Sequence, residues 1–325
     1  MRAIVRESYG GPEQLVVKDV PIPVPTDGEV RINVKAFGIN RAETYMRRGT
    51  WGDVATISGI ECVGVVDLDP SGRWRPGQTV AAIMGGLGRT RPGSYAEYTC
   101  APSTNVFALE TGIPWPELAA IPESFATAWW CLFNNLRLEP GHAVLVRGAT
   151  SALGEAAVNI AADLGASVLG TTRHATKTQR LSSLGAAHVL TETREVAGVV
   201  RDLFPAGVDR VLDLIGNSTL RDSLRTLKPG GKLCQAGFLG GPDPVDAFNP
   251  ILDMPSDVDL SFFGSFVLGT DGFSTARIPM QRIVNRVAAG RYKAAPARVF
   301  AFEAVPDAHR LMESNGANGK IVVEV

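Results

Sequence analysis

A regular alternation of strand-like and helix-like segments runs from His142 to about Phe238. The strand-like runs are AVLVRG, SVLGTTR, HVL, VDRVLDLIG and GKLCQAGF, and between them lie ALGEAAVNIAADLG, TKTQRLSSLG, EVAGVVRDLF and STLRDSLRTL, which favour helices. Such βαβ alternation requires parallel strands with crossover helices, and strands covered on both faces read as nearly continuous apolar runs. The pattern predicts an α/β domain with a doubly wound parallel sheet.

The sequence on either side of this alternation has a different character. Residues 1 to about 120 are rich in Gly and Pro and contain short β-prone runs such as EVRINVKAFGI and VGVVDLD. A helical stretch, WPELAAIPESFATAWWCLFNNL, leads into the alternating region, and after about Gly240 come a β-like LSFFGSFVLG, a helical IPMQRIVNRVAAG and a strand-like KIVVEV. Because 325 residues exceed what one core usually supports, we expect two domains.

Charge and hydropathy exclude several classes of protein. With 32 Lys and Arg against 33 Asp and Glu, the chain has no basic field for a phosphate backbone, so nucleic acid is not the expected partner. No window approaches a membrane span, and the start, MRAIVRESYG, lacks a secretory signal, so we expect a cytoplasmic protein without a membrane partner. The four scattered cysteines are expected to be small buried hydrophobic residues.

The first strand-to-helix turn of the alternation, Arg147-Gly148-Ala149-Thr150-Ser151-Ala152-Leu153-Gly154, lies where a dinucleotide fold binds pyrophosphate. The strict G-x-G-x-x-G pattern fails, because only the last of its three glycines is present. The turn follows a strand, precedes a helix and consists of small residues, and this context still favours a nucleotide site. The phosphate is expected to face the hydroxyls of Thr150 and Ser151 and the start of the helix at Ala152 and Leu153. The alternative is a small-residue turn with a capping serine.

The end of the second strand indicates which nicotinamide nucleotide is bound. An acid at this position is typical of NAD binding, and a basic residue accommodates the 2′-phosphate of NADP. Here the strand ends in Thr172-Arg173, with Lys177 four residues later, so the two cations can converge on one phosphate. NADPH is therefore the predicted cofactor; the alternative is a solvated basic turn.

The chain resembles the quinone oxidoreductase branch of the medium-chain dehydrogenase/reductases over essentially its full length. The resemblance is carried, in the family's order, by RESYGGPEQLVVKDVPIPVPTDGEVRINVKAFGINRAETYMRRG, GSYAEYTCAP, ESFATAWWCLF, GATSALGEAA, VLDLIGNSTLRDSLRTLKPGGKLCQAGFLGG, SFFGSFVLG and RVFAFEAVPDAHRLMESNGANGKIVVEV. It implies a Rossmann domain, residues 122–265, inserted into a β-rich GroES-like catalytic domain made of residues 1–121 and 266–325. It also implies a homodimer, joined through edge strands of the nucleotide domain such as DLSFFGSFVLG.

Two departures from the family are informative. Zinc-dependent relatives carry a Cys and a His as catalytic-zinc ligands and a four-Cys lobe, whereas the corresponding stretches here read FGINRAETY and SGIECVG. Glu43, Glu61 and Cys62 have no His near them in sequence, so no metal site is expected. A family Tyr that packs on the cofactor after the third strand is replaced by Thr191 and Glu192, and a carboxylate near a bound phosphate is unfavourable.

The resemblance also implies the residues of the active site. The substrate pocket of the family is lined by the stretch that reads Asn40 to Tyr45 here, and these two side chains can donate to a carbonyl oxygen that gains negative charge as hydride arrives. Asn40 can also be the N-cap of the helix that follows it. The alternative for Tyr45 is a half-buried packing residue. The further cofactor positions implied are Thr127, Ile215, Gly216, Phe238, Leu239, Phe266, Val267 and Lys320.

The function predicted from these observations is NADPH-dependent hydride transfer, without zinc, to a quinone or a related conjugated carbonyl. Without a metal, the cofactor carries the chemistry and the protein supplies positioning, exclusion of water and hydrogen bonds. Reduction of the carbon–carbon double bond of an enal or enone is an alternative within enzymes. A non-catalytic NADPH-binding regulatory protein is an alternative from a different class.

Overall fold

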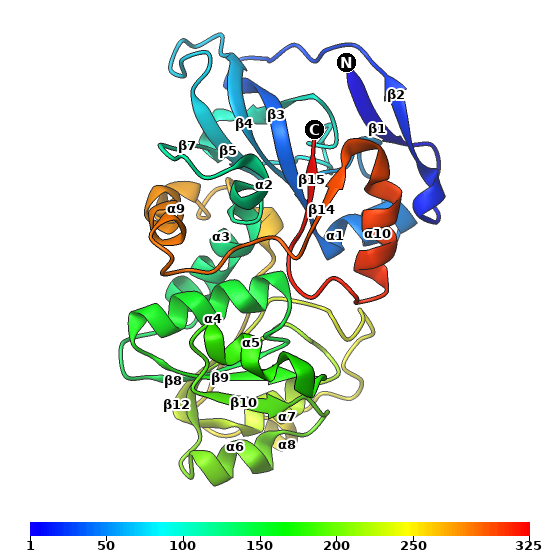
Figure 1. The fold of residues 1–325 in the computed structure, drawn as a ribbon. Helices are drawn as coiled ribbons and strands as arrows, with labels where there is room; N and C mark the ends of the chain where they lie inside the picture. The colour runs from blue at the N-terminus through cyan, green and yellow to red at the C-terminus, as the bar shows by residue number, and fades with distance from the viewer. The chain divides into compact units, whose positions relative to one another are not determined.

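The computed structural model describes residues 1–325, which form two compact units (Figure 1). The first unit comprises residues 1–126, 265–290 and 294–325, and the second comprises residues 127–264 and 291–293. Each helix is too short or too polar to cross a lipid bilayer.

The second unit is built on a six-stranded sheet in which every neighbouring pair is parallel. The strand order is β10-β9-β8-β11-β12-β13. The strands are β8 (Ala143–Arg147), β9 (Ser167–Thr172), β10 (His188–Thr191), β11 (Val208–Asp213), β12 (Leu227–Gln235) and β13 (Asp259–Phe262). The helices are α4 (Ala152–Leu164), α5 (Thr178–Ser183), α6 (Ala197–Leu203), α7 (Leu220–Arg225) and α8 (Pro250–Asp253). Figure 1 shows α4 and α5 on one face of the sheet and α6 and α7 on the other, so the predicted doubly wound sheet is confirmed.

Local sequence explains why the first βα unit forms. All five residues of β8 are buried, as expected for a central strand covered on both faces. Helix α4 begins after Ser151, whose hydroxyl accepts a hydrogen bond from the backbone N–H of Gly154, and it ends at Gly165, which has a left-handed φ of 91°. The Ser151 cap fixes the start of the helix at the carboxyl end of β8, and Gly165 fixes its end.

The first unit is β-rich and antiparallel in its main part. Its strands are β1 (Arg2–Arg6), β2 (Leu15–Asp19), β3 (Glu29–Ile39), β4 (Glu61–Leu68), β5 (Thr79–Ile83), β6 (Tyr98–Pro102), β7 (Val106–Ala108), β14 (Arg298–Ala301) and β15 (Ile321–Glu324). Its helices are α1 (Arg41–Arg48), α2 (Trp115–Leu118), α9 (Met280–Ala288) and α10 (Val305–Glu313), and α3 (Pro122–Trp130) carries the chain into the second unit. A seven-stranded sheet has the order β14-β15-β3-β4-β5-β7, with β6 also paired to β3, and β1 and β2 form a separate pair.

Strand β3 organises the core of the first unit. Val30, Ile32 and Val34 are buried at alternate positions, as a period of two requires for a strand with one face on the core. The end of β3 is buried throughout, and there Phe37 stacks on Tyr95 with a centroid separation of 4.7 Å. The core therefore continues to the residues just before Asn40.

The structure refines one sequence-based expectation at the element level. The stretch WPELAAIPESFATAWWCLFNNL, expected to be helical, is interrupted, because α2 ends at Leu118 and α3 begins at Pro122. Proline fits the first turn of a helix but not its interior, so Pro122 favours a new start there.

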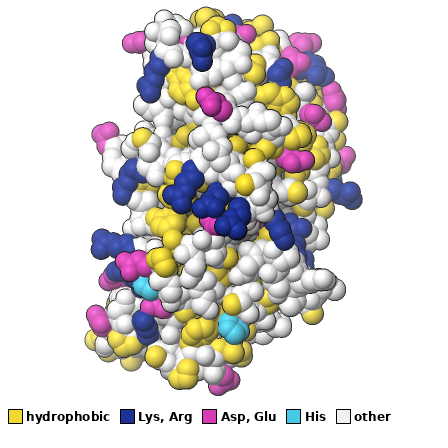
Figure 2. Space-filling view, turned by 60° about the vertical axis from the view of Figure 1, so that its left-hand side comes forward, with side chains coloured by type: hydrophobic (Ala, Val, Ile, Leu, Met, Phe, Trp, Pro, Cys, Tyr) yellow, Lys and Arg dark blue, Asp and Glu magenta, His cyan; other side chains and the backbone are white.

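The surface carries charges of both signs. Figure 2 shows lysine and arginine side chains in short groups, with uncharged surface and acidic side chains around them. Hydrophobic side chains are scattered over the same face in small groups. This distribution agrees with the near balance of 32 basic and 33 acidic residues.

Candidate functional site

The turn between β8 and α4 packs closely enough to require its remaining glycines. Gly148 has a left-handed φ of 76°, and a Cβ on Gly154 would lie 2.5 Å from the carbonyl oxygen of Gly148. Gly154 therefore allows the first turn of α4 to approach the loop, which is the role of the last glycine in a dinucleotide-binding turn. The two missing glycines of the pattern are replaced by the small residues Ala149 and Ser151.

The hydroxyl of Ser151 is engaged within the loop. It donates to the carbonyl of Gly148 at 2.8 Å and accepts from the N–H of Gly154 at 3.1 Å, so Ser151 is the capping serine. The N–H groups of Ala152 and Leu153 occupy the first two positions of α4, where no intrahelical acceptor exists. Because α4 has 13 residues, its N-terminus presents these donors and a positive dipole end beside the half-buried Thr150.

Arg173 and Lys177 lie directly after β9 and in the short turn that follows it. Burial and the positive charge of Arg173, four residues earlier in the chain, lower the pKa of Lys177. Neither forms an ion pair or a side-chain hydrogen bond. Glu155, whose charge also acts on Lys177, is bonded to Arg180, with 2.7 Å from Nη2 to Oε2.

The loop after β11 is fixed by Asp213, the last residue of that strand. The fully buried Asp213 accepts the N–H groups of Ile215 and Gly216, both at 2.9 Å, on one carboxylate oxygen. Gly216 has a φ of 96°, which favours glycine. The N–H of Leu239, after β12, donates to the carbonyl of Leu214. The structure thus brings Ile215, Gly216 and Leu239 together at the carboxyl end of the sheet.

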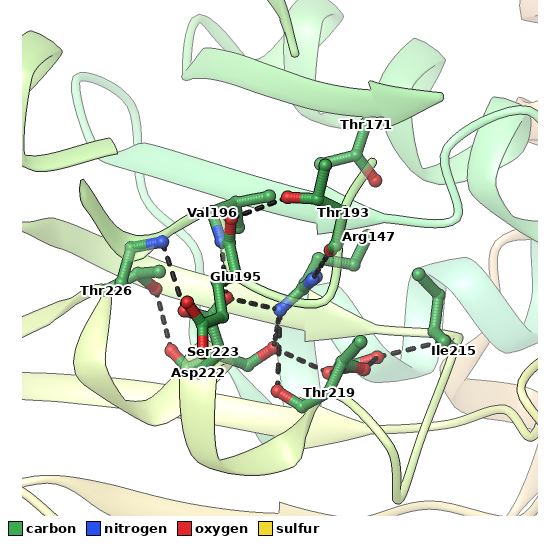
Figure 3. A network of polar contacts seen from close by, with 12 residues as sticks. Arg147, Thr171, Thr193, Glu195, Val196, Ile215, Thr219, Asp222, Ser223 and Thr226 are labelled. Atoms are coloured by element: carbon green, nitrogen blue, oxygen red, sulfur yellow. Dashed lines mark hydrogen bonds and ion pairs between the residues drawn. The ribbon is translucent and has the colours of Figure 1, made fainter. Parts of the chain in front are cut away.

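Beneath these loops lies a buried ionic network centred on Arg147, the last residue of β8 (Figure 3). The guanidinium group is 0% exposed. It pairs with the carboxylates of Glu192 and, at 2.8 Å, Asp222, and it donates to the carbonyl of Thr193 at 2.7 Å and to the hydroxyl of Ser223 at 3.1 Å. One side chain therefore connects the ends of β8 and β10 with helix α7.

The network continues to the start of α6 and to Asp213. Asp222 accepts the N–H groups of Val196 and Ala197, and the hydroxyl of Ser223 donates to Asp213 at 2.6 Å. Burial acts to lower the pKa of Arg147, but the bonds to Glu192 and the charges of the aspartates outweigh it, so the pKa is raised. The guanidinium is therefore positively charged among three carboxylates, those of Glu192, Asp213 and Asp222.

In the first unit, a second buried cluster joins residues that lie far apart in the sequence. The Lys320 ammonium pairs with the Glu61 carboxylate and donates to Asn40 Oδ1 at 2.6 Å. Asn40 Nδ2 donates to Glu61 at 2.9 Å, and the other Glu61 oxygen accepts the N–H of Glu123 at the start of α3. A Cβ on Gly38 would overlap both Glu61 and Lys320, so glycine at this position in β3 leaves room for the pair.

Next to this cluster lies a line of buried ionisable side chains. Glu43 is 0% exposed and accepts the N–H groups of Asn40 at 2.5 Å and Ile60 at 3.0 Å. Burial raises the pKa of Glu43 to about 7, against the lowering effect of these N–H groups and of the Lys320 charge. Burial and the negative charge of Glu43 raise the pKa of the Tyr95 hydroxyl, which is buried in the same line.

His309 continues this line. Its Nε2 lies 3.0 Å from the Tyr95 hydroxyl and its Nδ1 lies 3.4 Å from Nη1 of the buried Arg47. Because arginine can only donate, Nδ1 accepts and Nε2 carries the proton, so the Tyr95 hydroxyl oxygen accepts from the imidazole. Burial and the charge of Arg47 lower the pKa of His309 to about 3, so the imidazole is neutral.

The residues at this site do not suit a zinc ion. No group of three or more His, Cys, Asp or Glu side chains is arranged to hold a metal. Both oxygens of Glu61 are already engaged. Burial and the charge of Glu61 raise the pKa of Cys62 to about 12, which opposes the thiolate form that binds metals. Zinc chemistry therefore has no donor set here.

The other predicted residues lie as follows. The ring of Tyr45, in α1, packs against Trp51 with a centroid separation of 5.8 Å. Thr127 is buried in α3, and Phe238 packs against Phe262 with a centroid separation of 6.0 Å. Phe266 is 44% exposed and half-buried Val267 follows it in a short turn of the first unit, where the guanidinium of Arg89 lies 4.6 Å from the Phe266 ring centroid.

Sequence reasoning missed the partners in both buried clusters. The sequence presents Glu61 only as a candidate metal ligand and Arg147 only as the residue before the glycine turn. Their sequence signal is a charged residue directly beside an apolar run: Arg147 ends the strand AVLVR, and Glu61 begins the strand ECVGVVDL. Such residues need partners when buried, but the pattern does not say which partners.

Comparisons with known proteins agree with this geometry. Residues 26–111 match the family described as alcohol dehydrogenase GroES-like domain, and residues 184–323 match the family described as zinc-binding dehydrogenase. The chain is 28% identical over 337 residues to quinone oxidoreductase from Homo sapiens, covering 99% of this chain and 97% of that protein. It is 30% identical over 257 residues to 2-haloacrylate reductase from a Burkholderia species, covering 75% of each.

A solved structure shows the same fold. The mycobacterial protein Rv1454c, in complex with NADPH, has a TM-score of 0.88 to this structure at 25% identity, with 100% of both chains covered. Together with the parallel sheet and the GroES-like unit, these likenesses identify the family. The chain belongs to the zinc-independent medium-chain dehydrogenase/reductases, in the quinone oxidoreductase family.

Proposed function

We propose that this oxidoreductase uses NADPH to reduce a quinone or a related conjugated carbonyl compound by hydride transfer. The observation that carries the proposal is the pair of unpartnered cations, Arg173 and Lys177, at the carboxyl end of β9. Two adjacent cations without a carboxylate partner fit a phosphate group that binds there. The NADPH bound to the related mycobacterial protein supports a nicotinamide nucleotide as the source of that phosphate.

The residues present fit such a nucleotide. We propose that the N–H groups of Ala152 and Leu153 bind the pyrophosphate and that Thr150 adds a hydroxyl, while Ser151 caps the helix. Arg173 and Lys177 would bind the 2′-phosphate. When bound, NADPH would supply the hydride from C4 of its nicotinamide ring.

The proposed contribution of the first unit is polarisation of the acceptor. Asn40 Nδ2 donates one of its two N–H groups to Glu61. The Lys320 ammonium donates two of its three N–H groups, one to Asn40 and one to Glu61. Asn40 and Lys320 therefore each keep one N–H donor. Each remaining donor can bind a carbonyl oxygen that becomes negative as hydride arrives. It can equally bind a phosphate oxygen, which is already negative. Tyr45 is the further proposed donor, and Thr127, Ile215, Gly216, Phe238, Leu239, Phe266 and Val267 are proposed to line the cofactor.

Reduction of a conjugated carbon–carbon double bond is the second candidate function. The relative named 2-haloacrylate reductase favours it, because an acrylate carries such a bond. Steady-state rates with a quinone, an enal and an enone at equal NADPH concentration separate the two candidates. NADPH binding without turnover of any of these acceptors would instead support a regulatory nucleotide-binding protein.

Cofactor choice is tested by measuring the Kd of NADPH and of NADH for the wild type and for Arg173→Ala. Charge-assisted hydrogen bonds contribute about 1.5–3 kcal/mol, so we expect the variant to weaken NADPH binding at least about tenfold and NADH binding much less. Arg225→Ala, at the exposed end of α7, is the matched control. An equal loss for both nucleotides would contradict the assignment of the 2′-phosphate.

We also propose a homodimer formed through β13, the edge strand of the parallel sheet. Leu260 and Phe262 in this strand are 39% and 55% exposed, which is high for large apolar side chains. Light scattering at micromolar concentration tests this, and a monomer would contradict it.

A further inference from the structure

The ion pair between Arg147 and Glu192 spans the end of a strand that neither residue belongs to. Arg147 ends β8 and Glu192 follows β10, while β9 lies between these two strands in the sheet. The guanidinium is fully buried and Glu192 is 7% exposed at its side chain. Arg147 also donates to the carbonyl of Thr193 (Figure 3), so both Glu192 and the residue after it are held by the same guanidinium group.

The register of β9 and β10 places Glu192 beside the proposed phosphate-binding cations. Thr191 pairs with Thr172, and the N–H of Glu192 donates to the carbonyl of Thr172 at 2.8 Å. Arg173 follows Thr172 directly in the sequence. The backbones of Glu192 and Arg173 are therefore neighbours, yet the carboxylate bonds to Arg147 and Arg173 has no partner.

The alternative pairing of Glu192 would abolish the phosphate site. A carboxylate bonded to Arg173 would neutralise it and would also place a negative charge where the 2′-phosphate has to bind. An acid at this end of the sheet is the feature with which dinucleotide folds select the ribose 2′-hydroxyl of NAD. The buried guanidinium of Arg147, with donors for both Glu192 and Asp222, holds the acid away from that position.

We infer that Arg147 is a positioning residue for cofactor specificity, which sequesters the carboxylate of Glu192 and thereby keeps Arg173 and Lys177 available for the 2′-phosphate. This inference rests on the proposed NADPH-dependent function. It adds a determinant outside the residues that contact the phosphate. It also assigns a role to the carboxylate that replaces the family's tyrosine.

The test compares the ratio of the NADH Kd to the NADPH Kd in the full-length protein. Arg147→Gln releases Glu192, and we expect the ratio to fall at least about tenfold because Glu192 competes with the 2′-phosphate for Arg173. In Arg147→Gln/Glu192→Gln the released acid is absent, so the ratio returns to within about twofold of the wild type. Asp222→Asn is the matched control, since it removes the other partner of Arg147 without freeing Glu192, and we expect an unchanged ratio.

A purely structural role of Arg147 would weaken both nucleotides equally and leave the ratio constant in Arg147→Gln, which would overturn the inference. Glu192→Gln tests it again if Arg147→Gln does not fold. Because the acid is already held in the wild type, its removal should change the ratio by less than about twofold; a tenfold rise would show that Glu192 repels the phosphate despite Arg147 and would also overturn the inference. Failure of the proposed function is distinct: the wild type and Arg173→Ala would then have the same ratio.

Discussion

Two buried side chains, Glu43 and His309, lead to a quantitative prediction about stability and pH. Burial raises the pKa of Glu43 from 4.5 to about 7 and lowers that of His309 from 6.5 to about 3. The raised carboxyl pKa gives stability that is complete below pH 4.5 and is lost as pH rises through 7. The lowered imidazole pKa gives stability that is complete above pH 6.5 and is lost as pH falls towards 3.

Between pH 4.5 and 6.5 the two effects oppose each other. Over these two pH units each group changes the free energy of unfolding by about 3 kcal/mol, since one pKa unit corresponds to about 1.4 kcal/mol. The contribution of Glu43 falls with pH while that of His309 rises, so their sum is nearly constant in the wild type. The substitution Glu43→Gln removes only the contribution of Glu43 and leaves that of His309.

The assay is urea unfolding of wild type and Glu43→Gln at pH 4.5, 5.5 and 6.5, followed by tryptophan fluorescence. We expect the free energy of unfolding of the variant to rise by about 3 kcal/mol from pH 4.5 to 6.5 relative to the wild type. His309→Gln should show the opposite slope, and the exposed Glu324→Gln is the control with the wild-type slope. A constant difference between wild type and Glu43→Gln across this range would refute the reasoning.

Three further predictions concern packing and reactivity. Gly38→Ala should lower the free energy of unfolding by about 3–5 kcal/mol in urea titrations, because the added Cβ separates Lys320 from Glu61. Gly198→Ala is the control: it lies in α6 with open space around it and should not destabilise the protein. Ser151→Ala removes the cap of α4 and should cost about 1 kcal/mol in the same titration; an unchanged midpoint would contradict the capping role. Cys62, whose thiol pKa is raised to about 12, should resist iodoacetamide at pH 8 until urea unfolds the chain, as mass spectrometry can check.

Parts of the candidate site followed from the sequence because they depend on neighbouring residues. The turn from Arg147 to Gly154 was predictable because an apolar strand, small residues and a capping Ser151 determine a local structure. The basic residues after β9, Arg173 and Lys177, were also predictable, since the strand-to-helix spacing places them at the end of the sheet. The resemblance to the family supplied the positions of Asn40 and Lys320, but not the contact between them.

The sequence by itself determined the parallel sheet, the phosphate-binding turn and the β-rich surroundings, because hydrophobic period, turns and caps act over a few residues. Only the tertiary structure decided the partners of the buried charges. Glu61 meets Lys320 across 259 positions, and Arg147 selects Glu192 and Asp222 from many acids in the chain. A buried charge requires a counter-charge, but strand order and register determine which residue provides it.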